Sequence, residues 1–306
     1  MFQVAAHPTS FDSHKHGHGH RSSHSSSQHY HQQPAVSSSV QLPRTLARPP
    51  FADISREALI AASPELANVP SEYIRRRLRD TAPQMMAGIA SLAPSHLPST
   101  LPRSHLPSYL SIPIRSQSNH SSAQPSYPTH LLAIAPSKPS SSHSADALTI
   151  VPTHALVLAS QCALLPRFPA SSSAHPGSPQ IQLPIIPVSL PSPAAFQLLH
   201  PFLYTHNLGA LLASLLPMPQ GFVQAPGFGG DHVKHVLGSG QKLHELSVYL
   251  CQISHSLSAL TTHAAHIKEL WQDCVALGIY DVELWDAVDL AWEVVLGAMN
   301  LAATRQ

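Results

Sequence analysis

Residues 147–168, ALTIVPTHALVLASQCALLPRF, decide the fold more than any other stretch of this chain. Their β-branched start predicts a strand, the proline predicts a turn, and the apolar run after His154 predicts a helix. Residues 181–190, IQLPIIPVSL, predict a second strand. Residues 192–205, SPAAFQLLHPFLYT, predict a helix that begins after a capping serine. Strands followed by helices indicate an α+β fold.

The composition indicates a folded core diluted by proline and serine. The chain has 306 residues with 43% apolar and 11% charged side chains and 30 prolines, which excludes a wholly disordered or collagen-like protein. Its net charge of +1 gives no general argument for a nucleic-acid or acidic partner. Residues 168–230 contain no Asp, Glu, Lys or Arg. We therefore expect this uncharged stretch to be covered by another segment or by a partner.

Five segments differ in composition, and each has a predicted organisation. Residues 1–50 are predicted to be a disordered tail with eight histidines, and 51–92 a short helical segment. Residues 93–143 are predicted to be a linker, too proline-rich for a helix or a central strand. Residues 144–220 are predicted to form an α/β module, and residues 221–306 a helical unit.

No cofactor and no metal site are predicted. The HKHGHGH tract could bind a transition metal, but it has no cysteine nearby, so a polar low-complexity tail is the preferred interpretation. Three scattered cysteines without a CxxC motif indicate buried thiols in a reducing compartment. No signal peptide or membrane span is predicted, so we expect an intracellular protein without a membrane partner.

The C-terminal helices carry the most regular pattern in the sequence. Apolar residues between Leu243 and Cys274 alternate at spacings of three and four, which predicts one long heptad helix. A bundle within the chain is preferred to a coiled coil between chains, and a homodimer is left open. Residues 281–303 predict a final helix with Trp285 and Trp292 on an apolar arc and Glu283 and Asp286 on an acidic arc.

Four arginines stand close together in a predicted helix, in the sequence RRRLR: Arg75, Arg76, Arg77 and Arg79. A solvated helix surface is the first interpretation and a nuclear-import signal the second. Direct contact with nucleic acid comes last, because no zinc finger, basic zipper or RNA-binding motif accompanies the run.

No catalytic residues are predicted. The sequence has no GxSxG, GxxxxGK[ST], HExxH, or GxGxxG after a strand, so an enzyme is the weakest hypothesis. The serines and histidines lie mostly in low-complexity sequence and do not make a rigid catalytic triad.

The α/β module resembles the BTB/POZ interaction fold in a degenerate form. Asp146 opens the first strand and His154 opens the helix after it. The later helix ends in Leu203-Tyr204-Thr205, as in that fold. The strand between Asp146 and His154 is short, and Ala155 replaces the usual basic residue. The resemblance implies a protein–protein interaction module.

The order of parts also resembles the clampless-type proteins of fungal sexual development. It is carried by ELANVPSEYIRRRLRD, VPTHALVLASQCALLP, LPIIPVSLPSPAAFQLLHPFLYT and ELWQDCVALGIYDVELWDAVDLAWEVVLGAMNLAA. The resemblance implies a non-enzymatic nuclear regulator of clamp-cell formation and dikaryon growth in basidiomycetes, with transcription factors of mating control as its partners.

An adaptor of this kind is expected to bind through apolar surface, with large aromatic residues as anchors. At least one of the two tryptophans is expected in the core instead. Reversing Glu283 and Asp286 to lysine is expected to weaken binding while the fold survives. The predicted partner-binding residues are Phe196, Leu199, Leu203, Tyr204, Glu283, Trp285, Asp286 and Trp292.

Overall fold

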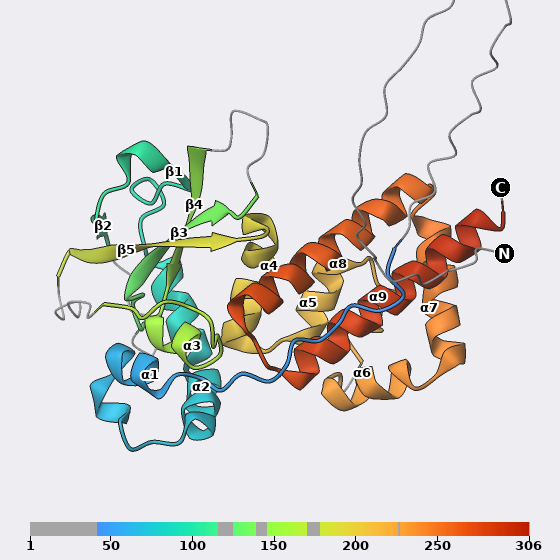
Figure 1. Cartoon of the computed structure of the whole chain (residues 1–306), viewed down its shortest axis with the longest axis horizontal. Coiled ribbons are helices and arrows are strands. Elements are labelled where there is room, and N and C mark those ends of the chain that lie inside the picture. The colour runs from blue at the N-terminus through green and yellow to red at the C-terminus, as the bar shows by residue number, and fades with distance from the viewer. Residues whose placement is uncertain (1–41, 116–124, 139–145, 170–177, 226, 306) are drawn as a thin grey trace, which may run out of the picture. The chain divides into compact units, whose positions relative to one another are not determined.

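The computed structural model of the chain describes residues 42–115, 125–138, 146–169, 178–225 and 227–305 (Figure 1). All helices and strands named below belong to one unit, residues 45–306. The predicted histidine-rich tail lies almost entirely outside the described residues, as does the HKHGHGH tract.

Two helices open the unit, as the sequence predicts. Helix α1 (Arg56–Ala62) begins at Ser55, whose Oγ accepts a hydrogen bond from the Ala58 backbone N–H. The short 3₁₀ turn η1 (Pro64–Leu66) leads to α2 (Ser71–Ala90), which starts directly after Pro70. The second helix extends beyond the predicted RRRLR region and includes Pro83.

Five strands form one curled sheet in the spatial order β1-β4-β3-β5-β2. Strand β3 lies in the middle, antiparallel to β4 and parallel to β5. A 3₁₀ turn, η2 (Arg103–His105), joins the first two strands. The strands are β1 (Thr100–Pro102), β2 (Tyr109–Pro113), β3 (His130–Pro136), β4 (Ala147–Thr153) and β5 (Gln180–Leu190).

The prediction of a strand-free linker over residues 93–143 is wrong. Three of the five strands fall in this range, and β3 occupies the centre of the sheet. Its sequence, HLLAIA followed by Pro136, has prolines only outside the run or at its last position. A central strand covered on both faces needs no alternation of polar residues, so its short apolar run lacks the usual strand pattern.

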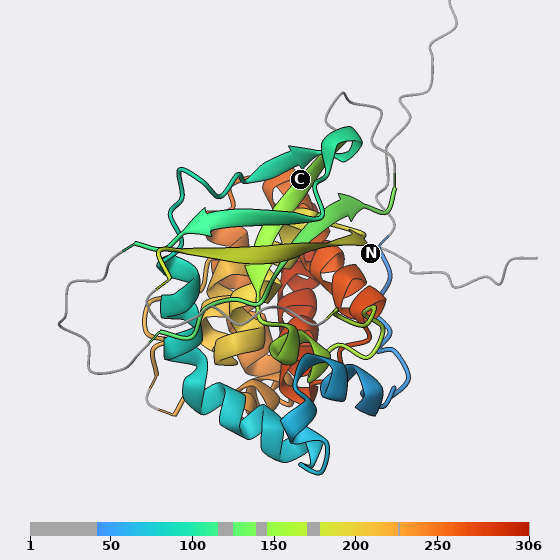
Figure 2. The ribbon, with the colours of Figure 1, turned by 90° about the vertical axis from the view of Figure 1, so that its left-hand side faces the viewer.

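The central strand β3 is buried on both faces of the sheet. Leu131 and Ala133 of β3 pack on one face with Ile112, Leu148 and Leu183. The side chains between them, such as Leu132 and Ile134, are also buried. Figure 2 shows the strands above the helices, and α4 and α8 contact β3 and β5 respectively.

The helices from the uncharged stretch are covered by other parts of the same chain. Helix α4 (Pro193–Thr205) contacts α2, α3 (Ala155–Ala159) and α8, and α5 (Leu208–Leu215) contacts α8 and α9. The Ser192 side chain caps α4 as predicted, accepting from the Ala195 N–H. For α4 and α5, the structure shows the first of the two predicted ways of covering the stretch, another segment of the chain.

The C-terminal unit is built around one helix. Helix α9 (Val282–Ala303) matches the predicted final helix, and the Asp281 side chain caps its first turn. Helices α5, α6 (Gly230–Leu237), α7 (Gly240–Ile253) and α8 (Leu257–Leu277) all pack against it. Eleven of its residues are buried, so α9 is a central helix rather than a surface helix with one apolar arc.

The predicted single heptad helix over 243–274 is two helices. The chain leaves α7 at Ser254, passes His255 in the left-handed region with φ 51°, and starts α8 at the Ser256 cap. The Ser256 hydroxyl accepts from the Ala259 N–H, which stabilises a new helix start within the periodic pattern. Because α7 and α8 each pack on α9, the apolar seam serves a bundle within the chain.

Candidate partner-binding surface

The six apolar residues predicted to bind a partner lie in the core. All six are at most 1% exposed. Four of them belong to α4 and face its neighbouring elements: Phe196, Leu199, Leu203 and Tyr204. The other two, Trp285 and Trp292, lie inside the bundle around α9. The prediction of an apolar surface open to solvent is therefore wrong for these residues, which pack against other parts of the chain. Both tryptophans are core residues, where one at least was expected to be.

The two acidic residues of the same prediction also have partners within the chain. Asp286 is 6% exposed, and its Oδ1 receives Arg48 Nη2 at 2.6 Å. Glu283 lies against α6, so close to Gly230 that an added Cβ would stand 2.6 Å from its Oε1. A lysine at position 286 would put a cation beside Arg48 in a buried place. The expectation that the fold survives reversal of both residues is therefore revised.

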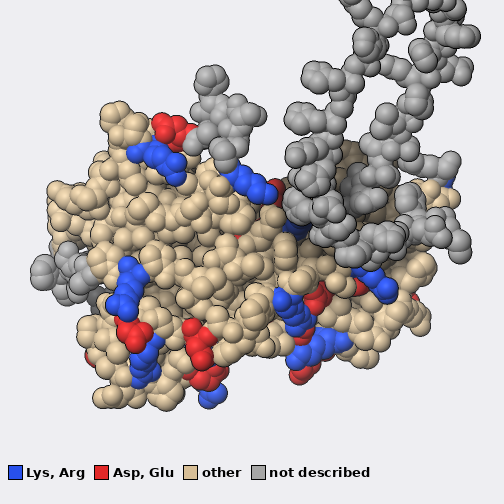
Figure 3. Space-filling model, viewed as in Figure 1, with Lys and Arg blue, Asp and Glu red and all other residues tan. Residues whose placement is uncertain are grey.

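The arginine run lies on the exposed side of α2, mostly within ion pairs. Arg75 pairs with Glu72 at 2.7 Å, and Arg77 pairs with Asp80 at 3.2 Å. Arg79 lies 3.8 Å from Asp281, a carboxylate that also contacts His206. Figure 3 shows basic and acidic groups largely in mixed clusters on the face it presents. A mixed surface of this kind gives little support to direct nucleic-acid contact.

A buried polar cluster joins the strand, the short helix and α4. The His154 backbone N–H donates to the Tyr204 hydroxyl at 3.0 Å, and the same oxygen lies 3.1 Å from His154 Nδ1. The rings of His200 and Tyr204 meet edge to face at 5.0 Å. Burial lowers the pKa of both His154 and His200 to about 4 and raises that of Tyr204 to about 12. These groups stay neutral at neutral pH, and their contacts hold β4, α3 and α4 together.

A second buried cluster fastens α8 to the start of α4. Asp273 is fully buried, and its Oδ1 accepts the Ser192 backbone N–H at 2.9 Å. Glu269, one turn earlier, accepts the Ser192 hydroxyl at 3.0 Å. Asp273 Oδ2 has no hydrogen-bond partner in the structure. Burial, with a further contribution from Glu269, raises the pKa of Asp273 to about 7.

Residues 45–51, here called the strap, run from the N-terminal side over α8 and α9. Figure 1 shows this blue segment crossing α9 on its way from α1. Arg48 Nε donates to Asp289 Oδ2 at 3.0 Å, in addition to its bond to Asp286. The Trp271 indole N–H donates to the Ala47 carbonyl at 2.8 Å, and the Phe51 ring meets Tyr280 edge to face at 4.7 Å.

The strap lies largely within residues 1–50, the predicted disordered tail, so its contacts with α8 and α9 are not predicted from the sequence. One signal was present. The acidic arc of the final helix had no basic partner nearby in the sequence, and Arg48 is one of the few cations in front of the first helix. Charge balance alone could not choose Arg48, since Arg44 stands four residues earlier.

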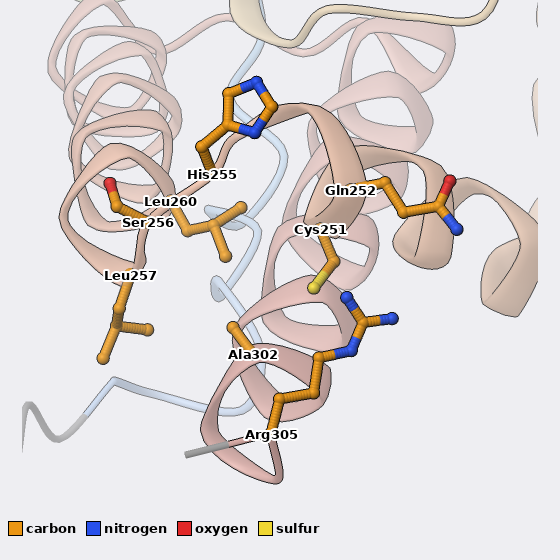
Figure 4. A pocket seen from close by; sticks show the side chains of 8 residues that line it. All are labelled: Cys251, Gln252, His255, Ser256, Leu257, Leu260, Ala302 and Arg305. Carbon is orange, nitrogen blue, oxygen red and sulfur yellow. The ribbon is translucent and has the colours of Figure 1, made fainter.

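Two of the hollows on the described surface have polar side chains in their walls. The larger, about 400 Å³, lies at the α7–α8 turn between Cys251, His255 and Arg305. Figure 4 shows the Cys251 sulfur directed towards Ala302 and Arg305, and the His255 ring directed away from it. A smaller hollow of about 290 Å³ lies beside the strap, with Phe51 and Tyr280 in its wall. In neither hollow is a nucleophile hydrogen-bonded to a base.

Within the described residues there is no group of three or more His, Cys, Asp or Glu side chains that could hold a metal ion. All three cysteines are free and buried, as the sequence predicts. Among the helices that the structure describes, none is long and apolar enough to cross a membrane.

Two family models match the chain, and together they cover most of it. Residues 49–191 match the N-terminal domain of clampless protein 1, and residues 209–306 match its C-terminal domain. The chain belongs to the clampless protein 1 family. Membership implies a role in clamp connection and sexual development, and the family is not known as an enzyme family. A search of curated proteins and a search of solved structures each gave no match.

The family boundaries agree with the structure better than the predicted segments do. The first domain includes α1, α2 and all five strands, and so takes in the range predicted to be a linker. The second domain starts inside α5 and contains the whole bundle around α9. Helix α4 lies between the two matched ranges and contacts elements of both.

Proposed function

We propose that this clampless family member is a non-enzymatic regulator of basidiomycete sexual development that acts in the nucleus as an adaptor for transcription factors. Family membership over both domains carries the proposal. An adaptor needs a stable scaffold and an accessible surface. The fused sheet and bundle supply the scaffold, and the acidic side of α9 with the strap upon it supplies a surface.

The BTB-like character of the module is part of this proposal. Asp146 directly precedes β4, His154 occupies the position before the first residue of α3, and Leu203 and Tyr204 stand near the end of α4. The two motifs of the resemblance touch, since the His154 N–H donates to the Tyr204 hydroxyl. This contact supports the view that they form one module. Its adaptor role would use surfaces other than the buried residues of α4.

The arrangement of polar groups also favours binding over catalysis. His154, His200 and Asp273 have shifted pKa values, but each is buried inside the scaffold. A catalytic group must reach a substrate from a cleft. These buried groups join elements of the fold instead.

Deletion of the gene followed by rescue tests the developmental role. We expect the deletion strain to lose clamp cells and stable dikaryotic growth, and the full chain to restore both. The tagged full chain should accumulate in nuclei and co-purify with a transcription factor of mating control from dikaryotic cells. Normal clamp formation in the deletion strain would refute the developmental role, and capture of no transcriptional partner would refute the adaptor mechanism.

A further inference from the structure

We propose that the surface of α8 and α9 that the strap covers, here called the groove, is a docking site for an extended, arginine-bearing peptide of a partner protein, and that the strap is its built-in competitor. The inference deepens the proposed function, because it names the surface and the class of partner that an adaptor would use.

The groove selects an arginine by charge and by geometry. Asp286 and Asp289 stand three residues apart on α9, and their carboxylates meet the same guanidinium at 2.6 and 3.0 Å. Two carboxylates one turn apart repel each other, so a cation between them relieves that repulsion. The planar guanidinium can donate to both at once, whereas the ammonium of lysine lacks this fork.

A second observation marks the groove as a binding site. Asp286 is 6% exposed, and its Oδ2 is buried without a hydrogen-bond partner. The Trp271 indole N–H points at a backbone carbonyl, which any extended peptide could supply in place of Ala47. Leu46, two residues before Arg48, is 5% exposed. The recognised pattern is an apolar residue, any residue, then arginine.

The strap holds its place with few contacts. Leu46 is its one buried residue, and the Arg48 side chain stays 39% exposed although it is paired. Pro49 and Pro50 favour an extended backbone, and no helix or strand forms over these residues. A segment held by one buried apolar side chain, a partly exposed ion pair, one hydrogen bond and one ring contact at an exposed residue opens at a lower free energy than the whole fold.

The walls of the groove do not depend on the strap. Trp271 belongs to α8, and both aspartates belong to α9, whose other contacts are with α5, α6 and α7. When the strap leaves, the exposed carboxylates regain water, so the fold loses little. A tethered segment competes at an effective concentration in the millimolar range, so a partner peptide must either bind tightly or make further contacts.

Peptide binding to purified full-length protein tests the proposal. The probe is a fluorescent peptide of residues 45–54, TLARPPFADI, measured by anisotropy against the wild-type chain and the Leu46→Ala/Arg48→Gln chain. We expect the double variant to bind the probe at least about tenfold more tightly, because its own strap no longer competes. A probe with glutamine for its arginine should not bind, and one with alanine for its threonine should bind normally.

The acidic wall has a matched control on the same helix. In the double variant, Asp289→Asn should weaken probe binding, whereas Glu293→Gln, one turn further along on the exposed side, should not. Equal effects of the two substitutions would mean a non-specific charge attraction and would overturn the proposal.

Hydrogen exchange gives a second measurement with an internal reference. Arg48→Gln alone should speed exchange of the Trp271 indole N–H, and leave that of Trp285, which donates to the Ile279 carbonyl inside the core, unchanged. An unfolded double variant, a folded one that ignores the probe, or equal acceleration at both tryptophans would overturn the proposal. So would a wild-type dimer that Arg48→Gln dissolves, since it would assign the groove to a second copy. The purified assay does not depend on the developmental role, so the two proposals can fail separately.

Discussion

The sheet and the bundle each surround one central element, strand β3 and helix α9, but the neighbours of that element come from different distances along the chain. Strand β3 pairs with β4 and β5. These two strands pair in turn with β1 and β2, which are far from them in the sequence. Helix α9 is enclosed by α5, α6, α7 and α8, which precede it in one continuous stretch. The bundle is thus encoded locally, and the sheet depends on long-range pairing.

Large core truncations should show whether the two halves unfold together. Trp292→Ala in α9 and Ile134→Ala in β3 each remove a side chain that is at most 1% exposed. We expect losses of about 3–5 and about 2–5 kcal/mol in the free energy of unfolding. Tyr73→Ala, at a residue 56% exposed, is the control and should change it by less than about 0.5 kcal/mol.

Denaturant unfolding followed by tryptophan fluorescence and by far-UV circular dichroism measures these losses. Because α4 contacts elements of both halves, we expect one cooperative transition in every variant. Two separated unfolding transitions in either variant would contradict the prediction that α4 couples the sheet to the bundle.

A glycine on the sheet side provides the next test. Segment 125–127 passes so close to α2 that a Cβ on Gly88 would stand 1.6 Å from the Ser126 carbonyl oxygen. Gly88→Ala should therefore cost about 1–3 kcal/mol, measured by thermal unfolding. The control is Gly240→Ala at the start of α7, where a Cβ meets nothing within 4 Å. Equal stability of the two variants would contradict the close approach.

The free energy of unfolding should depend on pH through Asp273, which joins α8 to the start of α4. Its pKa is about 7 in the folded chain, against an ordinary value of 3.8, so the folded state binds the extra proton between these pH values. The contribution of Asp273 to the stability of the fold is fully present below pH 4 and is lost as the pH rises towards and through 7. Asp273→Asn should therefore be more stable than the wild type at pH 8, by about 1–2 kcal/mol, because it removes a buried charge.

Chemical denaturation at pH 5, 6, 7 and 8 measures that difference. The two buried histidines act with the opposite sign, because their lowered pKa values make stability rise between pH 4 and 6.5. The variant's advantage should grow between pH 5 and pH 7 and level off above pH 7, where Asp273 is ionised in the folded chain as well. An advantage that is the same at pH 5 and pH 8 would mean that the Asp273 charge is not its cause.

The smallest effect is expected on the exposed side of α2. Arg76→Gln with Arg77→Gln should change the free energy of unfolding by less than about 0.5 kcal/mol, because both side chains are exposed. If the run is an import signal, a fluorescent fusion of this variant should leave the nucleus, whereas an Arg103→Gln fusion should not. Unchanged nuclear accumulation would remove the import role from these residues.

Sequence reasoning succeeded where the pattern was local. The β4 strand, the α4 helix with its Ser192 cap and the α9 helix with its Asp281 cap all have the predicted start, because capping residues and periodicity act within a few positions. The prediction is wrong at β3, whose five-residue apolar run LLAIA has no alternation, and at Ser256, where a helix start interrupts an unbroken heptad pattern.

The candidate site could not be predicted because its parts are far apart. Arg48 meets Asp286 across 238 positions, and the sequence offers no rule that pairs them. The same distance explains why Trp285 and Trp292 looked like surface anchors. Periodicity shows one apolar arc on α9, but only the tertiary fold reveals helices on its other sides.

The strap and α9 lie near opposite ends of the chain, and this order has a consequence during protein synthesis. At about 5–20 residues per second, a ribosome needs on the order of 10–50 s after residue 48 to deliver residue 286. Throughout that interval, Arg48 lacks its partners Asp286 and Asp289, and the bundle lacks its central helix α9. The nascent chain therefore carries its apolar helices α5 to α8 without their core. Synthesis of α9, residues 282–303, supplies the missing partner of both the bundle and the strap at the same time.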